Sequence, residues 1–475
     1  MADKRYQRLA NEIAHSIRAG VLKPGDRLPS VRQASAARRL SPSTVFQAYY
    51  QLEARGLVQS RARSGYYVAR ALPVLPPEPD TPSRPDGESR EVDISALVSE
   101  VLHSAMQHAE VVPLGSAFPS PLLFPLQRIG RAVASAAVHL DPWSTVDDLT
   151  PGQLALRRQI ALRYLIDGIE VPPEEIVVTN GALEALNLCL SAVTRPGDPV
   201  LVESPCFYAA LQSLEYQGLR AVEVPTHPRD GIDLDGLADA IARHAPRACW
   251  LMPTFQNPLG STMPEANKRA LVALLARHGI PLIEDDVYGE LHHAERRPLP
   301  AKAFDHDGLV MHCASFSKSL APGYRIGWVA AGRHARAVAR RKLAATLNTN
   351  VPAQLGLARY LQQGGFDRHL RRLRRALAAQ QAQYVDAIGR AFPAGTRVTR
   401  PAGGYFLWID LPDGADALRL QRRASAAGIS IAPGPMFSPS RGFGHCLRLN
   451  YGHPLDARVE AALQALGRMA AGAAS

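Results

Sequence analysis

Six prolines between residues 71 and 90 divide this 475-residue chain into two unequal parts. Proline removes a backbone donor and favours extended backbone, so a stretch this rich in proline is typical of a semi-stiff spacer. A structureless loop of this length inside one compact domain is uncommon. We therefore predict a head over residues 1–70, a proline-rich linker over residues 71–91 and a body over residues 92–475.

Charge is divided as unevenly as length. The whole chain has a formal net charge of +11, and its first 70 residues hold thirteen Lys and Arg against four Asp and Glu. The head therefore carries about +9 of that charge, and the much longer remainder is nearly neutral. Such asymmetry indicates a nucleic acid or another anionic surface as the partner of the head.

Composition excludes several classes of protein. A hydrophobic content of 46% with 20% charged residues is typical of a globular chain rather than a disordered one. No apolar run is long enough to span a membrane, and the N-terminus has no apolar signal core, so we expect a cytoplasmic protein with no membrane partner. The five cysteines are scattered without a CxxC motif, so neither a metal site nor a disulfide framework is expected.

The head reads as three helices followed by a hairpin. Apolar residues from Tyr6 to Ile17 recur at helical spacing and predict the first helix. Ser30 with Gln33 is the pattern of a capping box, and Ser41 followed by proline marks the start of a third helix. Residues 57–69, LVQSRARSGYYVA, predict two short strands around a turn. This order predicts a winged helix-turn-helix, with the third helix as the recognition helix.

Basic and short polar side chains lie where such a head would meet DNA. Polar groups near the start of the third helix suit phosphates or base edges, and arginines on the second helix and the wing would neutralise phosphates. The alternative is an ordinary solvated face, but these residues lie on a scaffold predicted independently to bind DNA. The predicted contacts with a double-stranded DNA operator are Arg32, Ser43, Thr44, Gln47, Arg61 and Arg63.

Three segments of the head occur together in a known family. KPGDRLPSVRQ, SPSTVFQAYYQLEARGLV and SRARSGYYV follow one another over residues 23–68. In residue identity and spacing they resemble the GntR-type winged helix of bacterial regulators.

The body alternates short apolar strands with helical stretches. This alternation predicts an α/β fold with a mostly parallel sheet, and ligands in such sheets lie at the carboxyl ends of the strands. The predicted strands are residues 174–180, 198–205, 248–254, 281–286, 309–315 and 326–332.

Five strand ends carry polar or aromatic residues, and each has an ordinary structural explanation when it is taken alone. Taken together, they supply a Schiff-base lysine, an acid for a pyridinium nitrogen, groups for a phosphate and a stacking ring, which is the set that pyridoxal 5'-phosphate needs. Lys318 would form the internal aldimine, and Asp285 would keep the ring nitrogen protonated; these are the two predicted catalytic residues. The other predicted cofactor contacts are Phe207 for stacking, Asn257 and Tyr288 for the ring hydroxyl, and Gly181, Ala182, Ser315, Ser317 and Arg325 for the phosphate.

The segments SFSKSLAPGYRIGW, QNPLG and EDDVY resemble fold-type I aminotransferases. The resemblance implies a large domain with a mostly parallel sheet and a smaller C-terminal α+β domain. It also implies that Arg448 grips the carboxylate of a substrate or effector, although a structural ion pair is the alternative. Two departures concern the phosphate contacts: Leu183 stands where many relatives carry Gln, and Asp148-Leu149 stands where a Tyr is often found.

The order of head, linker and body resembles the MocR family of transcriptional regulators. The resemblance implies a homodimer with its cofactor site near the subunit interface. Two functions stay open: a regulator that senses an amino acid or amine effector by aldimine exchange at Lys318, and an active aminotransferase with an accessory DNA-binding domain. A cofactor held only for structure is less expected, because Arg448 is kept.

Overall fold

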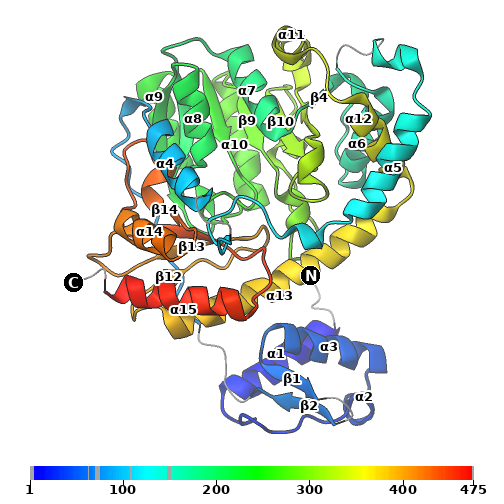
Figure 1. Ribbon diagram of the computed structural model, residues 1–475, viewed down its shortest axis with the longest axis vertical. Coiled ribbons are helices and arrows are strands. Elements are labelled where there is room, and N and C mark those ends of the chain that lie inside the picture. Colours follow the sequence, from blue (N-terminus) through cyan, green and yellow to red (C-terminus); the bar gives the residue numbers. More distant parts are fainter. Residues whose placement is uncertain (1–4, 62–63, 70–74, 107–109, 147–150, 473–475) are drawn as a thin grey trace.

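A computed structural model describes residues 5–61, 64–69, 75–106, 110–146 and 151–472 of the protein. A small head of helices and a hairpin lies beside a large body, on the side where the helices α13 (Gly365–Ala391) and α15 (Ala457–Ala471) run (Figure 1). No helix within the described ranges is long and apolar enough to cross a membrane.

The head has the predicted order of elements, and its helix caps are those that the sequence indicates. The Ser30 hydroxyl accepts a hydrogen bond from the Gln33 amide at 3.2 Å, and the Gln33 side chain accepts one from the Ser30 amide at 2.9 Å. The Ser41 hydroxyl accepts from the Thr44 amide at 3.2 Å and so caps the third helix. The elements are α1 (Arg5–Arg18), α2 (Val31–Arg38), α3 (Pro42–Ala54), β1 (Val58–Arg61) and β2 (Gly65–Val68).

A nine-stranded, mostly parallel sheet forms the centre of the body, in the order β3-β6-β5-β8-β9-β10-β11-β4 with β7 beside β6. The strands from β6 to β10 along this path run parallel, whereas β11 is antiparallel to both of its neighbours. All six predicted strands are present, and the sequence interpretation missed the long strand β6. The strands are β3 (Ser89–Glu91), β4 (Ile176–Thr179), β5 (Pro199–Ser204), β6 (Arg220–His227), β7 (Gly231–Ile232), β8 (Ala248–Leu251), β9 (Leu282–Asp285), β10 (Val310–Ser315) and β11 (Gly327–Ala330).

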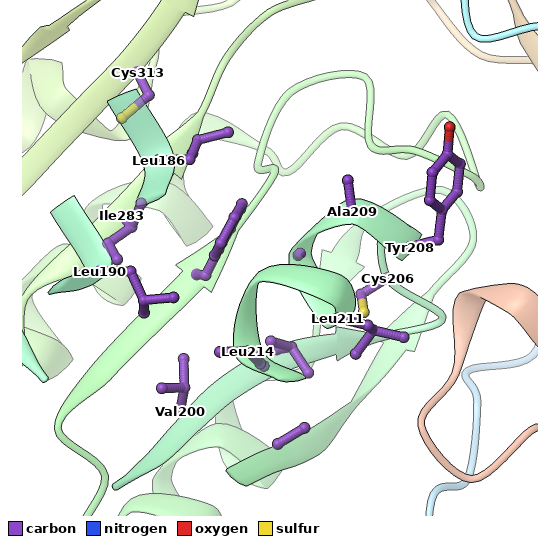
Figure 2. Packing of buried hydrophobic residues seen from close by; sticks show 14 of the residues in the cluster. Leu186, Leu190, Val200, Cys206, Tyr208, Ala209, Leu211, Leu214, Ile283 and Cys313 are labelled. Carbon is purple, nitrogen blue, oxygen red and sulfur yellow. The ribbon is translucent and has the colours of Figure 1, made fainter. Parts of the chain in front are cut away.

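Helices cover both faces of this sheet, because alternate residues of its buried strands point to opposite sides. On β5, Val200 packs with α7 and α8, as Figure 2 shows, whereas its neighbour Leu201 packs in the cluster with α9 and α10. The helices of this large domain are α4 (Ser95–Met106), α5 (Leu126–Val138), α6 (Leu154–Ile166), α7 (Ala182–Val193), α8 (Tyr208–Tyr216), α9 (Leu234–His244), α10 (Glu265–Arg277), α11 (Ala335–Thr346) and α12 (Val351–Gln362).

A smaller antiparallel sheet, in the order β12-β13-β15-β14, forms the C-terminal domain with three helices. Its core is a separate cluster of buried side chains, contributed mainly by α13, β13, β15 and α15. The resemblance to fold-type I enzymes implies this second domain, and the structure has it. Its further elements are β12 (Arg397–Val398), β13 (Phe406–Asp410), α14 (Ala417–Ala426), β14 (Ala432–Pro433) and β15 (Cys446–Asn450).

The described part of the proline-rich segment is not a free spacer. From Leu75 onward it lies along the body, and Ser89–Glu91 pairs with β6 as an edge strand of the large sheet. Pro76 and Gly87 are buried. Proline content favours extended backbone, but it carries no information about the surface on which that backbone lies.

Candidate functional site

Lys318 follows β10 and is the centre of the predicted cofactor site. Its Nζ donates a hydrogen bond to the Ala117 carbonyl at 2.8 Å and lies 3.6 Å from the centroid of the Phe118 ring. Burial, and next the positive charge of Arg448, lower the pKa of Lys318 to about 7, while Asp285 acts in the opposite sense. A large fraction of this amine is therefore neutral near pH 7, which is the form that attacks a carbonyl carbon.

Asp285 is the last residue of β9 and is almost completely buried. Its Oδ1 has no hydrogen-bond partner among the described residues. Burial, and next the neighbouring charge of Asp286, raise the pKa of Asp285 to about 7. A buried acceptor without a partner costs free energy, so this oxygen fits a ligand that brings its own N–H to the end of β9.

Asn257, Tyr288 and Arg448 meet on one side of this lysine. The Asn257 side chain donates to the Tyr288 hydroxyl at 3.5 Å and accepts from Nη1 of Arg448 at 2.9 Å. Arg448, on β15 of the small domain, is 1% exposed and donates from Nη2 to the Gly115 carbonyl at 2.8 Å. Its buried Nε has no partner among the residues that the structure describes. No carboxylate of the protein is bonded to its guanidinium in the described ranges, so the structural ion pair that was the alternative for Arg448 is not found there.

The start of α7 forms the other end of the site. Gly181 has a φ of +88° and caps α7, and no side-chain hydrogen bond of the described residues caps this helix start, so its first amides are open to an anion. A Cβ at Gly181 would lie 2.6 Å from Nη2 of Arg325, so glycine allows the guanidinium to approach the helix start. Nη2 of Arg325 also donates to the Asn180 carbonyl at 3.3 Å.

Ser315 ends β10, Ser317 precedes Lys318, and both serines are buried. The Ser315 hydroxyl accepts from the Ser317 amide at 3.3 Å, and the Ser317 hydroxyl is buried without a partner in the part of the chain that the structure describes. Donors without partners beside a cation and open helix amides fit a phosphate group.

Phe207 ends the loop after β5 and is half-buried. It packs both against the large-domain core and against the cluster that contains Tyr288. Its ring centroid lies 4.9 Å from that of Tyr208. The residue is therefore placed at the carboxyl edge of the sheet, where a stacking ring was predicted.

These residues fit pyridoxal phosphate in number and in chemistry. Among the described residues, the Asp285 oxygen without a partner could accept a hydrogen bond from a ring N–H. The Ser317 hydroxyl without a partner could donate to a phosphate oxygen, and the uncapped start of α7 suits the phosphate charge. The individual roles of the residues stay predictions.

Sequence reasoning missed three groups at the lysine. The Tyr405 hydroxyl donates at 2.9 Å to the same Ala117 carbonyl that Lys318 uses, and Phe118 lies under the ammonium group. Tyr405 stands in the segment PAGGYFLWIDLP, so an aromatic hydroxyl among glycines was a usable signal. Ala117 contributes only backbone, and no residue pattern could have identified it.

Of the two departures noted in the sequence, one can be placed. Leu183 lies in the first turn of α7, is 42% exposed, and its side chain carries no hydrogen-bond donor for a phosphate. Asp148 and Leu149 lie outside the described residues.

The predicted DNA-binding residues lie on α2, on α3 and in the wing. Arg32, Ser43, Gln47 and Arg61 are exposed, and Thr44 is half-buried. The hydroxyls of Ser43 and Thr44 lie 2.9 and 2.7 Å from the Ser41 hydroxyl, and the Arg61 guanidinium lies 4.3 Å from the Tyr67 ring centroid. Arg63 lies outside the described residues, and all of these DNA contacts stay predictions.

Comparison with known proteins matches both parts of the chain to families. Residues 5–68 match the family described as bacterial regulatory proteins, gntR family, and residues 148–466 match aminotransferase class I and II. The chain is 47% identical to YdcR of Escherichia coli (strain K12), named an uncharacterized HTH-type transcriptional regulator, over 98% of this chain and 99% of that protein.

A second relative, YjiR of the same strain, bears the same kind of name and is 38% identical over 98% of each chain. Among solved structures, LysN of Thermus thermophilus, an α-aminoadipate aminotransferase complexed with N-(5'-phosphopyridoxyl)-L-leucine, superposes with a TM-score of 0.72 and 30% identity. That match covers 81% of this chain and 96% of LysN.

The head therefore belongs with gntR-type regulators and the body with class I and II aminotransferases, in the same order as in full-length relatives. The chain is a member of the MocR family of regulators, in which a winged helix is fused to an aminotransferase-like domain.

Proposed function

We propose that this protein is a DNA-binding transcriptional regulator whose body holds pyridoxal 5'-phosphate and senses an amino acid or amine at Lys318. The observation that carries the proposal is a complete lysine site on the same chain as a gntR-type head. In that site, as far as the described residues go, the lysine is bonded to a backbone carbonyl alone, and Asp285 and Arg448 retain unpartnered atoms.

When it is bound, the cofactor supplies a carbonyl carbon that exchanges one amine for another and a ring that withdraws electrons. The chain supplies the rest. Asp285 would pair with the ring nitrogen, Arg448 would offer a planar pair of donors to a carboxylate, and the start of α7 with Arg325 would hold the phosphate. An incoming amine would replace Lys318 on the cofactor, and the Ala117 carbonyl, which accepts from Lys318 Nζ among the described residues, would hold the freed side chain.

The guanidinium of Arg448 is held in place by its neighbours, which favours binding of a carboxylate. Its Nη1 bonds Asn257 and its Nη2 bonds a backbone carbonyl, so the guanidinium plane is fixed before any ligand arrives. The Phe406 ring lies 4.1 Å from its central carbon and supports that plane. A fixed guanidinium loses little conformational entropy when it binds, so we expect amino acids to bind better than amines that lack a carboxylate.

The test is a spectral titration of the purified holoprotein against a panel of amino acids and their decarboxylated amines. The proposal expects at least one amino acid to release Lys318, seen as loss of the lysine–cofactor adduct that borohydride traps. If no compound of the panel changed the cofactor spectrum, the sensing role would be excluded.

A second function, turnover as an aminotransferase, is favoured by one observation. Lys318 has a pKa of about 7, so once released it can both accept and return a proton near neutral pH. Incubation of the holoprotein with an amino acid and a keto acid decides between the two functions. Formation of a new amino acid supports turnover, and release of Lys318 without product supports sensing alone.

A second copy of the chain is proposed to cover the phosphate end of the site. Leu183, Leu343 and Leu347 are exposed around the start of α7, where Glu184 bonds Lys342. Trp143, 71% exposed, lies on a turn that hydrogen bonds connect through Gln153 and Gln354 to the same region. Exposed apolar surface of this extent is typical of a protein–protein interface. A homodimer acting on DNA in the cytoplasm is the form that we propose.

A further inference from the structure

Residues 76–83, which lie between head and body in the sequence, are bound to both domains of the body. On the small domain, the Val398 amide donates to the Pro77 carbonyl at 2.9 Å, and the Arg400 guanidinium bonds the Pro76 carbonyl. Nη1 of Arg400 also lies 3.5 Å from the carboxylate of Glu78. Residues 76–78 are therefore fixed to the strand β12 and its continuation.

A few residues later the same segment is bound to the large domain through Ser83. The Ser83 amide donates to the Thr226 carbonyl at 3.1 Å, and the Thr226 amide donates to the Ser83 hydroxyl at 2.9 Å. The Ser83 hydroxyl in turn donates to the Ser204 carbonyl at 2.5 Å. One serine side chain thus bridges the ends of β5 and β6.

Ser204 is the last residue of β5 and leads directly to the predicted stacking residue Phe207. The next carbonyl, that of Pro205, accepts from the Gln256 side chain at 2.7 Å. Gln256 precedes Asn257, which binds Arg448. The contact of Ser83 is therefore with the backbone that carries one side of the cofactor site.

We infer that Ser83 is a positioning residue for the cofactor site: it fixes the end of β5 that carries Phe207, and it makes the segment 76–83 the connection through which the site acts on the head. This inference rests on the proposed function, because it names the route by which occupancy of the body reaches the DNA-binding domain.

The sequence of the segment suits this task. Proline at positions 77, 79 and 82 restricts the backbone to extended forms, so the segment cannot absorb a displacement by coiling. Its two anchors lie on different domains, the small-domain sheet at Pro77 and the large sheet at Ser83. A movement of one domain relative to the other, or of the end of β5, is therefore transmitted along the segment.

The variant Ser83→Ala removes the hydroxyl that bonds both strand ends, and Thr81→Ala is its matched control on an exposed side chain two residues earlier. Both are made in the full chain. The probe is pyridoxal 5'-phosphate alone, added to the apoprotein. The readouts are its dissociation constant, the visible circular dichroism of the bound cofactor, and hydrogen exchange of the segments 76–90 and 203–208.

In the wild type and in Thr81→Ala, loading is expected to slow exchange in both segments. In Ser83→Ala, loading is expected to slow exchange in 203–208 less and in 76–90 not at all. The dissociation constant should rise about threefold to tenfold, as for the loss of one or two hydrogen bonds. The circular dichroism band should weaken, because a loosened Phe207 no longer fixes the ring. The variant Ser83→Thr keeps a hydroxyl and should restore the cofactor affinity, the circular dichroism band and the slowed hydrogen exchange.

The inference is overturned if Ser83→Ala and Thr81→Ala both match the wild type in cofactor dissociation constant, hydrogen exchange and circular dichroism. The proposed function is untouched by that result. If the wild type itself fails to hold the cofactor at Lys318, the proposed function fails, and this inference fails with it. A weakened band in Ser83→Ala that Ser83→Thr does not restore also counts against the hydroxyl as the cause.

Discussion

Two basic residues, the half-buried Lys318 and the buried Arg448, set the electrostatics of the site. Burial is the largest influence on each and lowers the pKa of both, and the charge of Arg448 lowers the pKa of Lys318 further. The arginine keeps its charge because its ordinary pKa is so high, whereas the lysine gives up its proton near neutral pH. We propose that Arg448 holds a ligand, and its charge also helps to keep the neighbouring amine neutral and reactive.

The first prediction concerns the pH dependence of cofactor attachment. The pKa of Lys318 falls from its ordinary value of 10.5 to about 7, so the neutral amine is dominant above pH 7. Well below pH 7, the neutral fraction falls tenfold for each pH unit. We expect the rate of attachment to the apoprotein, measured by stopped-flow absorbance, to rise with pH and level off above about 7.

In Arg448→Gln the inflection of this profile should move to higher pH, because a positive charge beside the amine is removed. Arg441→Gln, a change at an exposed arginine of the same domain, should leave the profile unchanged. An inflection that stays in place in Arg448→Gln would contradict the proposed coupling between the two cations.

The second prediction concerns Asp285. The amide of Asp285→Asn is nearly isosteric but cannot carry the negative charge that stabilises a protonated ring nitrogen. A hydrogen bond to a charged group contributes about 1.5–3 kcal/mol, so the dissociation constant of the cofactor should rise by about tenfold or more. Equilibrium dialysis measures it, and Asp239→Asn on the exposed face of α9 is the control. Equal affinities in the two variants would exclude the role proposed for Asp285.

At the scale of elements, local signals were read correctly from sequence where the chemistry is local. Ser30, Gln33 and Ser41 predict helix starts because their hydrogen bonds reach only three residues along the chain. The buried strands were recognisable because each is a short apolar run. The strand β6 was missed, since its sequence RAVEVPTH mixes charged residues and a proline with apolar ones.

The contacts that assemble the site were beyond sequence reasoning. Arg448 meets Asn257 although 191 residues separate them, and Lys318 meets a carbonyl 201 residues away. No local propensity encodes such distances. The residue types at the strand ends indicated the cofactor. Only the fold shows that Ala117 and Phe118 contact the lysine and that Tyr405 donates to the same Ala117 carbonyl.

The third prediction concerns the wing of the head. Arg61 ends the strand β1, and its exposed guanidinium lies over the Tyr67 ring. If it neutralises a phosphate, Arg61→Ala should weaken binding to all DNA sequences alike and reduce the slope of log K against log salt by about one. Fluorescence anisotropy at several salt concentrations measures this slope.

The control for the wing is Arg8→Ala, which removes an exposed arginine of α1 that is paired with Glu12. It should leave both the affinity and the salt slope close to those of the wild type. A slope unchanged in Arg61→Ala would count against a phosphate contact at the wing.

At the scale of the whole molecule, the proposed homodimer covers part of each cofactor site with the second copy. The fourth prediction is that Trp143→Glu, which places a charge in the exposed apolar region, shifts the protein from dimer to monomer in analytical ultracentrifugation. Cofactor retention should fall with it, because the phosphate end of the site would be open to solvent. Tyr216→Glu, at an exposed aromatic residue on α8, is the control and should stay dimeric. A Trp143→Glu protein that sediments as the wild type does would place the interface elsewhere.

The division of charge between head and body has a physical meaning in this arrangement. The basic head is drawn to any DNA by phosphate charge, so affinity alone carries no information about the effector. The body adds that information only if two states of its site differ in their effect on the head, and the coupling in such systems is typically about 1–3 kcal/mol. The segment anchored at Pro77 and Ser83 is the connection we propose for it.

The measurement that tests this account most directly is the DNA affinity of one holoprotein preparation before and after Lys318 is released. Aminooxyacetate, a small carboxylate-bearing amine that attacks the cofactor's carbonyl carbon, is the probe, and the DNA is a duplex that the holoprotein itself selects from a random pool. The account predicts a change in dissociation constant of about fivefold or more on addition of the probe. No change is expected in protein first reduced with borohydride, where Lys318 cannot be displaced. Release of Lys318, seen in the cofactor spectrum, with an unchanged DNA affinity would contradict the account.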